Sequence, residues 1–145
     1  NQFQRENTDT KENFHSCIIT LSEHPIGMIS LWNLGEFIYI EHFALAQQER
    51  NKGYGEKVLK HITQSVELPI ILEVEMPDDE TSKRRIGFYE RCGFVLHTNP
   101  YIQPPYRAKD EPLPMYLMTY GKLDMEKKYQ QIKERIYQEV YHWKE

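Results

Sequence analysis

The chain has 145 residues, of which 39 % are hydrophobic and 28 % are charged, and its formal net charge at pH 7 is −4. This length suits one domain with a sizeable core, so we expect residues 1–145 to form a single domain. The net negative charge argues against nucleic acid as a partner. No apolar run is long enough to cross a membrane, so we expect no membrane association.

The N-terminal part predicts a meander of short strands. Residues 1–13 are polar and show no periodicity apart from Phe3, so they predict a helix end or a loose tail. Three stretches rich in β-branched and aromatic side chains then predict strands, at residues 16–21, 26–32 and 37–45. The connections between them are short and rich in turn residues, which predicts antiparallel pairing.

A glycine-rich turn follows the third strand. A polar loop, residues 46–52, leads to Gly53 and Gly55, and an amphipathic helix is predicted over about residues 55–66. The N-terminus of such a helix presents unpaired N–H groups and a positive dipole end, which together favour a phosphate. Glycine permits a left-handed backbone and a close approach of an anion. The turn therefore predicts an anion site, unless it merely joins a strand to a helix.

The C-terminal part predicts a strand, a helix, a hairpin and a last helix. Residues 70–76 form a continuous run rich in strand-forming residues, which suits a central parallel strand. Asp79, Thr81 or Ser82 can cap the next helix, which Gly93 ends in the left-handed conformation. A hairpin of residues 94–98 and 113–120 is expected across a proline-rich loop, 99–112. A helix over about 123–143 carries an apolar stripe that should pack on the body or on a partner subunit: Met125, Tyr129, Ile132, Ile136 and Val140.

Two motifs in this order resemble the GNAT superfamily of acyl-CoA-dependent N-acyltransferases. Arg50-x-x-Gly53-x-Gly55, after a strand, is similar to that family's pyrophosphate-binding motif, and residues 86–94 (IGFYERCGF) resemble its later helix. A dinucleotide-binding fingerprint would need a third glycine where Val58 stands, and a P-loop would need a Gly-Lys-Ser/Thr run, which is absent. Neither of these two phosphate-binding motifs therefore fits. The resemblance covers most of residues 14–120.

The resemblance implies an α/β fold with an α+β-like mixed sheet, in which an antiparallel meander is followed by a β-α-β crossover. The C-terminal helix is an addition to this core. The family usually begins with a further strand and one or two helices, so that N-terminal segment is either missing or truncated here. Another element would then cover that flank of the meander, and the C-terminal helix is the obvious substitute.

The same resemblance implies acetyl-CoA as acyl donor. Backbone groups at the end of the third strand would hold pantetheine and the thioester, and the glycine loop would hold the pyrophosphate. Ser82 and Arg85 stand where the family often has asparagine and alanine near the cofactor. The implied cofactor residues are Phe43, Ala44, Leu45, Arg50, Asn51, Lys52, Gly53, Tyr54, Gly55, Glu56, Ser82 and Arg85. No metal is expected, because the histidines and cysteines show no ligand spacing.

Attack of a neutral amine on a thioester needs a base for the ammonium proton and an acid for the leaving thiolate. By its motif position Tyr89 is expected to be the acid, although it can instead be a tyrosine packed on the strands. Glu41 is the first candidate base, because a carboxylate inside a core strand is costly without a purpose or a partner. Strand alternation places it on the face of Tyr39 and Phe43, and His42 on the other. The resembled family often carries a bulge in this strand, which would change which of the two points into the cleft. The alternative is that Glu41 is an edge or salt-bridged glutamate without a catalytic role. His42 is the second candidate base, although it can also be a histidine of the core.

The loop after the hairpin's first strand is aromatic and stiffened by proline. We expect Tyr101, Gln103 and Tyr106 to line the acceptor pocket, since long loops in compact domains are often functional. The alternative is a rigid surface connection.

These features predict an N-acetyltransferase that moves acetyl from acetyl-CoA directly to a small-molecule or peptide amine. An acyl-CoA-binding regulatory module without activity, or transfer of another acyl group, stays open. Cys17 and Cys92 form no redox spacing, and no signal peptide is visible, so a cytoplasmic location is expected. A homodimer through the last helix is possible.

Overall fold

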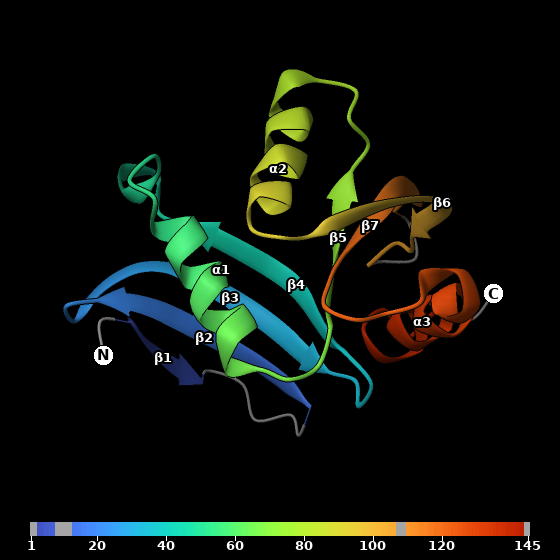
Figure 1. Ribbon diagram of the computed structural model, residues 1–145, viewed down its shortest axis with the longest axis horizontal. Helices are drawn as coiled ribbons and strands as arrows, with labels where there is room; N and C mark the ends of the chain where they lie inside the picture. The colour runs from blue at the N-terminus through green and yellow to red at the C-terminus, as the bar shows by residue number, and fades with distance from the viewer. Residues whose placement is uncertain (1–2, 8–12, 107–109, 144–145) are drawn as a thin grey trace. The chain divides into compact units, whose positions relative to one another are not determined.

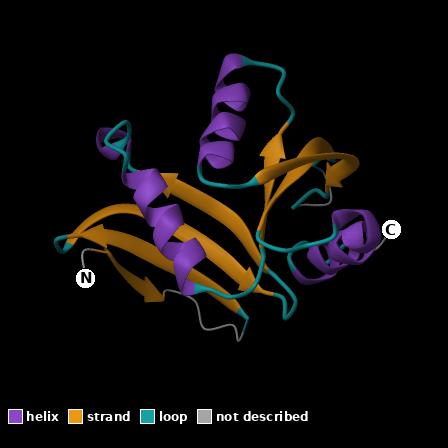
Figure 2. Cartoon of the chain, in the orientation of Figure 1, coloured by secondary structure: helices purple, strands orange, loops and turns teal. Residues whose placement is uncertain are grey.

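Seven strands and three α-helices follow one another along the part of the chain that the structure, a computed structural model, describes: residues 3–7, 13–106 and 110–143. They group into two compact units, Asn1–Leu68 and Pro69–Glu145, each of which is described by itself. Figure 1 labels the elements, and Figure 2 distinguishes helices, strands and loops by colour.

The first unit is an antiparallel meander followed by a helix. Its strands lie in the order β1-β2-β3-β4, and α1 crosses them in Figure 1. The element bounds are β1 Phe3–Asn7, β2 Phe14–Leu21, β3 His24–Asn33, β4 Ile38–Leu45, η1 Gln47–Glu49 and α1 Tyr54–Ser65. The three predicted strands and the predicted helix are present. Val58 and Leu59 of α1 are buried, as the amphipathic pattern predicts.

β1 corrects the prediction for the N-terminal residues. Residues 3–7 form neither a helix end nor a loose tail, because they pair antiparallel with β2, with Phe3 opposite Leu21. The remaining residues of that prediction, apart from Asn13, lie outside the described residues. β1 also takes the flank that we expected the C-terminal helix to cover. Strand pairing uses backbone groups, so it needs no apolar pattern in the added strand.

The second unit has three antiparallel strands in the order β5-β7-β6, so β6 is an edge strand of this unit. The element bounds are β5 Ile70–Glu75, α2 Glu80–Arg91, β6 Val95–Gln103, β7 Leu113–Tyr120 and α3 Met125–Glu139. Ile70, Ile71, Leu72 and Val74 of β5 are almost completely buried. This burial confirms the apolar strand that the sequence predicts at this position.

Local signals set both ends of α2. The Asp79 side chain accepts from the Ser82 N–H at 2.7 Å, which makes Asp79 the cap among the three candidates. Gly93 has a left-handed φ of 95°, and the N–H of Phe94 donates to the Tyr89 carbonyl at 3.0 Å. The Tyr89 and Phe94 rings lie edge to face across this end of the helix. This is the Schellman arrangement expected of a glycine there.

β6 is longer than predicted. We expected it to end at residue 98 and a loop to span 99–112, but the strand resumes pairing at Tyr101, opposite Met115, and continues to Gln103. Pairing is irregular between His97 and Tyr101. Because Pro100 lacks an N–H, it fits such a break in the ladder, and its turn chemistry is what suggested a loop.

α3 covers the edge strand of its unit. Of the predicted stripe, Met125, Ile132, Ile136 and Val140 are buried, which confirms the buried face. The hydroxyl of Tyr137 donates to the carbonyl of Ile102 in β6 at 2.5 Å, and the hydroxyl of Tyr129 donates to that of Pro100. The helix is shorter than predicted, because Asp124 caps it and it ends at Glu139.

Candidate active site

A bulge in β4 sets the position of the candidate base. Leu31 of β3 lies opposite Ile40, and Ser30 lies opposite His42, so Glu41 is an extra residue between two paired positions. An extra residue bends the strand and redirects its side chain. Bulges of this kind are enriched next to active sites.

The bulge corrects the predicted orientation of Glu41. An inserted residue reverses the alternation beyond it, so Tyr39 and Phe43 lie on opposite faces of β4 instead of sharing one. Glu41 lies toward Trp32, the residue opposite Tyr39, and not on the face of Phe43. The strict period of two was wrong here because it counts no bulge.

The Glu41 side chain is largely shielded from solvent, and a neighbouring side chain fixes its orientation. Its side chain is 10 % exposed, and the Trp32 indole N–H donates to Oε1 at 2.9 Å. His42 Nε2 lies 3.7 Å from Oε2, and the His42 side chain is 57 % exposed. The carboxylate therefore has one oxygen oriented by a fixed donor and the other beside an exposed imidazole, which suits transfer of a proton to solvent.

The glycine turn has the geometry of an anion site. Gly53 is the N-cap of α1 with a left-handed φ of 79°, and no atom lies within 4 Å of where its Cβ would be. No side chain caps this helix end. The first N–H groups of the helix, from Tyr54 onward, therefore have no side-chain cap, and they and the helix dipole favour an anion at this end.

Side chains before the turn shape its approach. The Arg50 side chain donates through Nε to the carbonyl of Leu45 at 3.3 Å, which ties the loop to the end of β4. Asn51 has a left-handed φ of 65°. Lys52 lies 3.4 Å from Glu49, so the positive charge beside the turn is partly balanced. The predicted cofactor residues Phe43, Ala44, Leu45, Gly55 and Glu56 lie in β4 and the first turn of α1.

The cofactor residues predicted in the second unit lie at the start of α2. Ser82 is buried, and its hydroxyl donates to Glu75 at the end of β5 at 3.5 Å. Hydrogen bonds from Ser82, chiefly from its backbone N–H, hold the pKa of Asp79 below its usual range. Arg85 is exposed one turn later. An exposed guanidinium beside a helix N-terminus suits contact with a phosphate.

Tyr89 is buried on α2 and stays protonated over a wide pH range. Burial raises the pKa of Tyr89 to about 12, while the positive charge of Arg85 acts in the opposite direction. Its ring packs edge to face with Phe88 and Phe94. Within the described part of its unit, its hydroxyl makes no hydrogen bond. The phenol therefore carries a proton at neutral pH, as a general acid must, although its raised pKa makes it a weaker acid than an ordinary tyrosine.

Two of the three predicted acceptor residues bind a carboxylate that sequence reasoning missed. Tyr101 and Gln103 lie in β6 rather than in a loop, and both donate to Glu73 of β5, Gln103 at 2.8 Å. The Tyr141 hydroxyl donates to the same carboxylate at 2.7 Å. Burial and Glu73 raise the pKa of Tyr101. Tyr106 is 53 % exposed and its ring lies 5.0 Å from that of Tyr141.

The available signal for Glu73 was its place between Leu72 and Val74 in the apolar part of β5, where burial demands partners for a carboxylate. The partners themselves carry no such signal, because they are distant in sequence.

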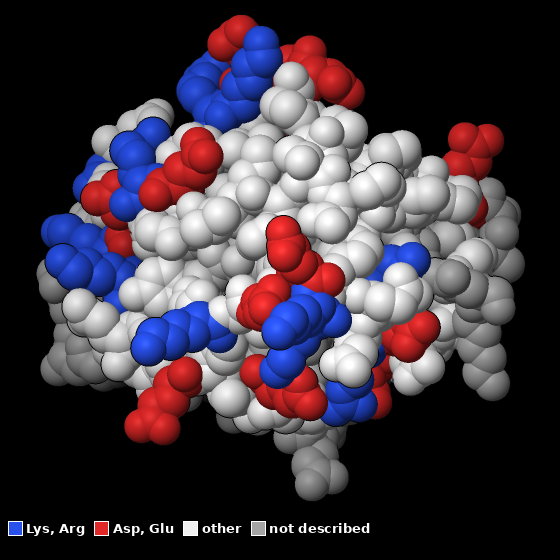
Figure 3. Space-filling model, turned by 45° about the vertical axis from the view of Figure 1, so that its right-hand side comes forward, with Lys and Arg blue, Asp and Glu red and all other residues white. Residues whose placement is uncertain are grey.

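Two other site classes find no support in the described residues. No group of three or more His, Cys, Asp or Glu side chains that could hold a metal occurs among them. None of the described helices combines the length and apolar character that crossing a membrane requires. On the face shown in Figure 3, positive and negative residues are intermixed rather than gathered by sign.

Comparison with known proteins agrees with the sequence motifs. A sequence model of the acetyltransferase (GNAT) family matches residues 1–94. A protein from Bacteroides thetaiotaomicron, assigned to the GNAT family as an acetyltransferase, is 48 % identical with a TM-score of 0.90. That match covers 94 % of this chain and 78 % of the other. No curated protein matches the chain.

Two solved structures of lower identity share the fold. A Bacillus subtilis acetyltransferase in complex with CoA is 11 % identical, with a TM-score of 0.60 over 83 % of this chain and 99 % of that one. An Elizabethkingia anophelis GNAT family acetyltransferase with acetyl-CoA bound is 15 % identical, with a TM-score of 0.63 over 83 % and 97 %.

Proposed function

This chain belongs to the GNAT family of acetyltransferases, and from that premise we propose that it transfers acetyl from acetyl-CoA directly to an amine nitrogen. The observation that carries the proposal is the turn at Gly53. A left-handed glycine that caps a helix, with open space where a side chain would stand, fits the pyrophosphate of CoA.

In the proposed reaction the amine nitrogen attacks the thioester carbonyl carbon, a C–N bond forms, and the C–S bond then breaks. Glu41, or His42 in its place, takes the proton that the nitrogen loses. The indole of Trp32 keeps the Glu41 carboxylate oriented for this step. Tyr89 gives its proton to the departing thiolate, and its phenol is protonated at working pH and so carries the proton that this step needs.

The acceptor is proposed only as a class, a small-molecule or peptide amine. Tyr101, Gln103 and Tyr106 stay candidates for its binding. Support for them is indirect: Glu73 holds Tyr101 and Gln103 in defined positions, which a specificity pocket requires.

We propose a cytoplasmic location, and it is supported by the absence of a disulfide at Cys17 and Cys92 in the described part of the chain. The apolar stripe of α3 is already buried within the chain, so it needs no partner subunit to cover it, and a homodimer through this helix is not part of the proposal.

A matched pair of substitutions at Gly53 tests the proposal. Asparagine and aspartate both tolerate a left-handed backbone, so Gly53→Asn and Gly53→Asp strain the turn alike, but only aspartate adds a negative charge. By calorimetry, acetyl-CoA should bind the wild type with micromolar affinity. Gly53→Asp should weaken binding at least about tenfold by repelling the pyrophosphate, and Gly53→Asn should keep it within about threefold.

Equal affinity of the aspartate and asparagine variants would exclude an anion site at the turn. Thiol release with mixed primary amines is then measured on the wild type. Tight acetyl-CoA binding without thiol release for any amine would favour the regulatory acyl-CoA-binding alternative.

A further inference from the structure

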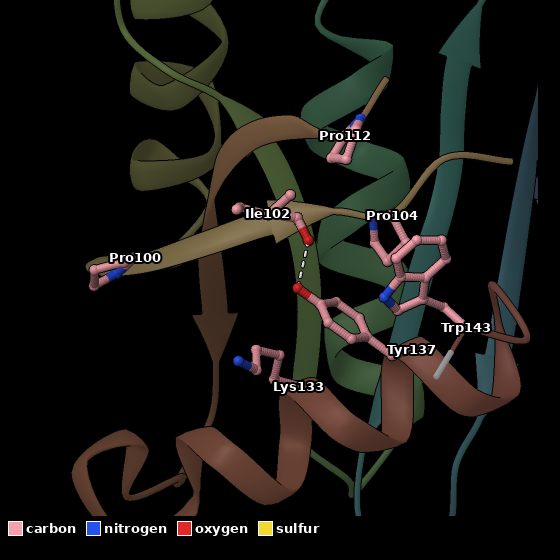
Figure 4. Close-up of a pocket in the computed structure, with 7 residues that line it drawn as sticks. All are labelled: Pro100, Ile102, Pro104, Pro112, Lys133, Tyr137 and Trp143. Carbon is pink, nitrogen blue, oxygen red and sulfur yellow. Dashed lines mark hydrogen bonds between the residues drawn. The ribbon is translucent and has the colours of Figure 1, made fainter. Parts of the chain in front are cut away.

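A cavity of about 460 Å³ opens between β6 and α3 in the second unit. Figure 4 shows that the side chains of Lys133 and Tyr137 rise from α3 toward β6. The residues that line the cavity are Pro100, Ile102, Pro104, Pro112, Lys133, Tyr137 and Trp143. Its volume lies within the range of about 300 to 1,000 Å³ that is usual for small-molecule sites.

The walls of this cavity are held by hydrogen bonds. The Tyr137 hydroxyl donates to the Ile102 carbonyl at 2.5 Å, and the Trp143 backbone N–H donates to the Tyr137 carbonyl at 2.8 Å. Behind the walls, Glu73 accepts from Gln103, which lies between Ile102 and Pro104, and from Tyr141. Both walls are therefore anchored to one carboxylate, so little ordering remains for a ligand to impose.

The polar groups in the cavity are donors. Lys133 brings a positive charge, with Nζ 5.7 Å from the centre of the Tyr137 ring. The Trp143 indole N–H makes no hydrogen bond with the rest of the described chain. Among the described residues that line the cavity none is acidic, and its prolines have no N–H to offer. The carbonyl of Ile102 is already taken by Tyr137.

The rest of the cavity wall is apolar but exposed to solvent. Ile102 is 49 % exposed and Trp143 is 37 % exposed, which is unusual for such large side chains beside three prolines. A flat or branched apolar group would cover them and lie against the Tyr137 ring. Rigid apolar walls with few converging donors are the general pattern of small-ligand sites.

We propose that this cavity binds a small organic carboxylate with an aromatic or branched apolar body. The Lys133 ammonium and the Trp143 indole N–H hold the carboxylate, and the proline wall holds the body. Lysine has three donors, so it can serve this acceptor in addition to its other contacts. The proposal does not depend on acetyl transfer, and its test measures binding alone.

Phenylacetate is the probe, added to the full chain labelled with nitrogen-15. The chain has only two tryptophans, and the Trp32 indole N–H is engaged with Glu41 in the other unit. The indole resonance of Trp143 should shift and saturate with a dissociation constant of about 0.1 to 1 mM, while that of Trp32 stays in place. Trp143→Phe assigns the two resonances.

Matched compounds and variants sharpen the test. Phenethylamine has the same ring with a cation in place of the anion, and should not bind. Lys133→Met keeps the apolar stem but removes the charge, and should weaken phenylacetate about tenfold. Lys127→Met, at an exposed position of the same helix, should change the affinity by less than about twofold.

No saturable shift of the Trp143 resonance up to about 10 mM phenylacetate would overturn the proposal. Equal binding of phenethylamine, or unchanged affinity in Lys133→Met, would overturn it as well, because either result denies the recognition of charge.

Discussion

Glu41 owes its orientation to a neighbour on the adjacent strand. The Trp32 indole holds Oε1 at 2.9 Å, and the bulge aims the side chain at Trp32 instead of at Phe43. A glutamine has the same shape and can still accept this hydrogen bond through its amide oxygen. The role of Glu41 can therefore be separated from its contribution to the strand.

Glu41→Gln should flatten the ascending limb of kcat/KM against pH, because the rate rises as the base loses its proton and an amide has none to lose. Turnover at the plateau should fall by about 10²- to 10⁴-fold. The thermal midpoint serves as the folding control. Amines of low pKa should suffer least, since they arrive already neutral.

A parallel ascending limb in Glu41→Gln would contradict this role and move the test to His42. His42→Gln is the matched substitution, because the imidazole is exposed and its loss leaves the strand packing in place.

Tyr89 combines a packed ring with a hydroxyl that is free of partners in its unit, so removing the oxygen leaves the ring contacts with Phe88 and Phe94. Tyr89→Phe should lower kcat by about 10²- to 10⁴-fold while acetyl-CoA affinity stays unchanged, as loss of a proton donor requires. Tyr120→Phe, on a ring that packs against Phe94, is the control for a lost phenol elsewhere. Unchanged kcat in Tyr89→Phe would return Tyr89 to a packing role.

The same substitution has a second readout at alkaline pH. The pKa of Tyr89 is about 12 in the folded chain against an ordinary value of 10.0, so between these pH values the unfolded chain binds fewer protons. The stability that this group contributes is fully present below pH 10.0 and falls as pH rises toward 12, by up to about 3 kcal/mol. Urea unfolding at several pH values should show that the free energy of unfolding of Tyr89→Phe falls less steeply between pH 10 and 12 than that of the wild type. Tyr101 is present in both proteins and contributes equally to both.

α3 stabilises an edge strand in two ways. Its apolar stripe is buried, and the hydroxyls of Tyr129 and Tyr137 donate to carbonyls of β6. Unpaired carbonyls at a sheet edge invite pairing with other chains, so these tyrosines also protect the edge. The helix is thus part of the fold of its unit and not an appendage.

Ile136 and Glu134 provide a matched pair on this helix. Ile136 is completely buried, so Ile136→Ala should lower the free energy of unfolding by about 2 to 5 kcal/mol. Glu134 is exposed, and Glu134→Ala should change it by less than about 0.5 kcal/mol. Urea unfolding measures both. Equal stability of the two variants would mean that the stripe contributes little.

The chain as a whole forms two compact units, and its length led us to expect one domain. If residues 1–145 are one cooperative domain, the indole resonances of Trp32 in the first unit and Trp143 in the second should lose intensity at the same urea concentration. A saturating amount of acetyl-CoA should move both midpoints together. Separate midpoints would instead show two units that unfold independently.

The parts of this protein that follow from nearby residues could be predicted from the sequence. The turn at Gly53, the cap at Asp79 and the helix end at Gly93 each depend on groups within a few positions of one another. The buried faces of α1 and α3 follow from a helical period that burial then confirms. The family resemblance rested on two such local motifs, and comparison with known proteins confirms it.

Distant pairings were decided only by the tertiary structure. β1 is polar and pairs through its backbone, the bulge at Glu41 depends on the register against β3, and Tyr101 enters β6 because Met115 lies opposite it. Glu73 meets Tyr101, Gln103 and Tyr141 across 28, 30 and 68 positions of sequence. A local sequence pattern indicates which groups need partners. Residues that are distant in sequence come into contact only when the chain closes the loops between them, so only the folded structure shows which partners these groups have.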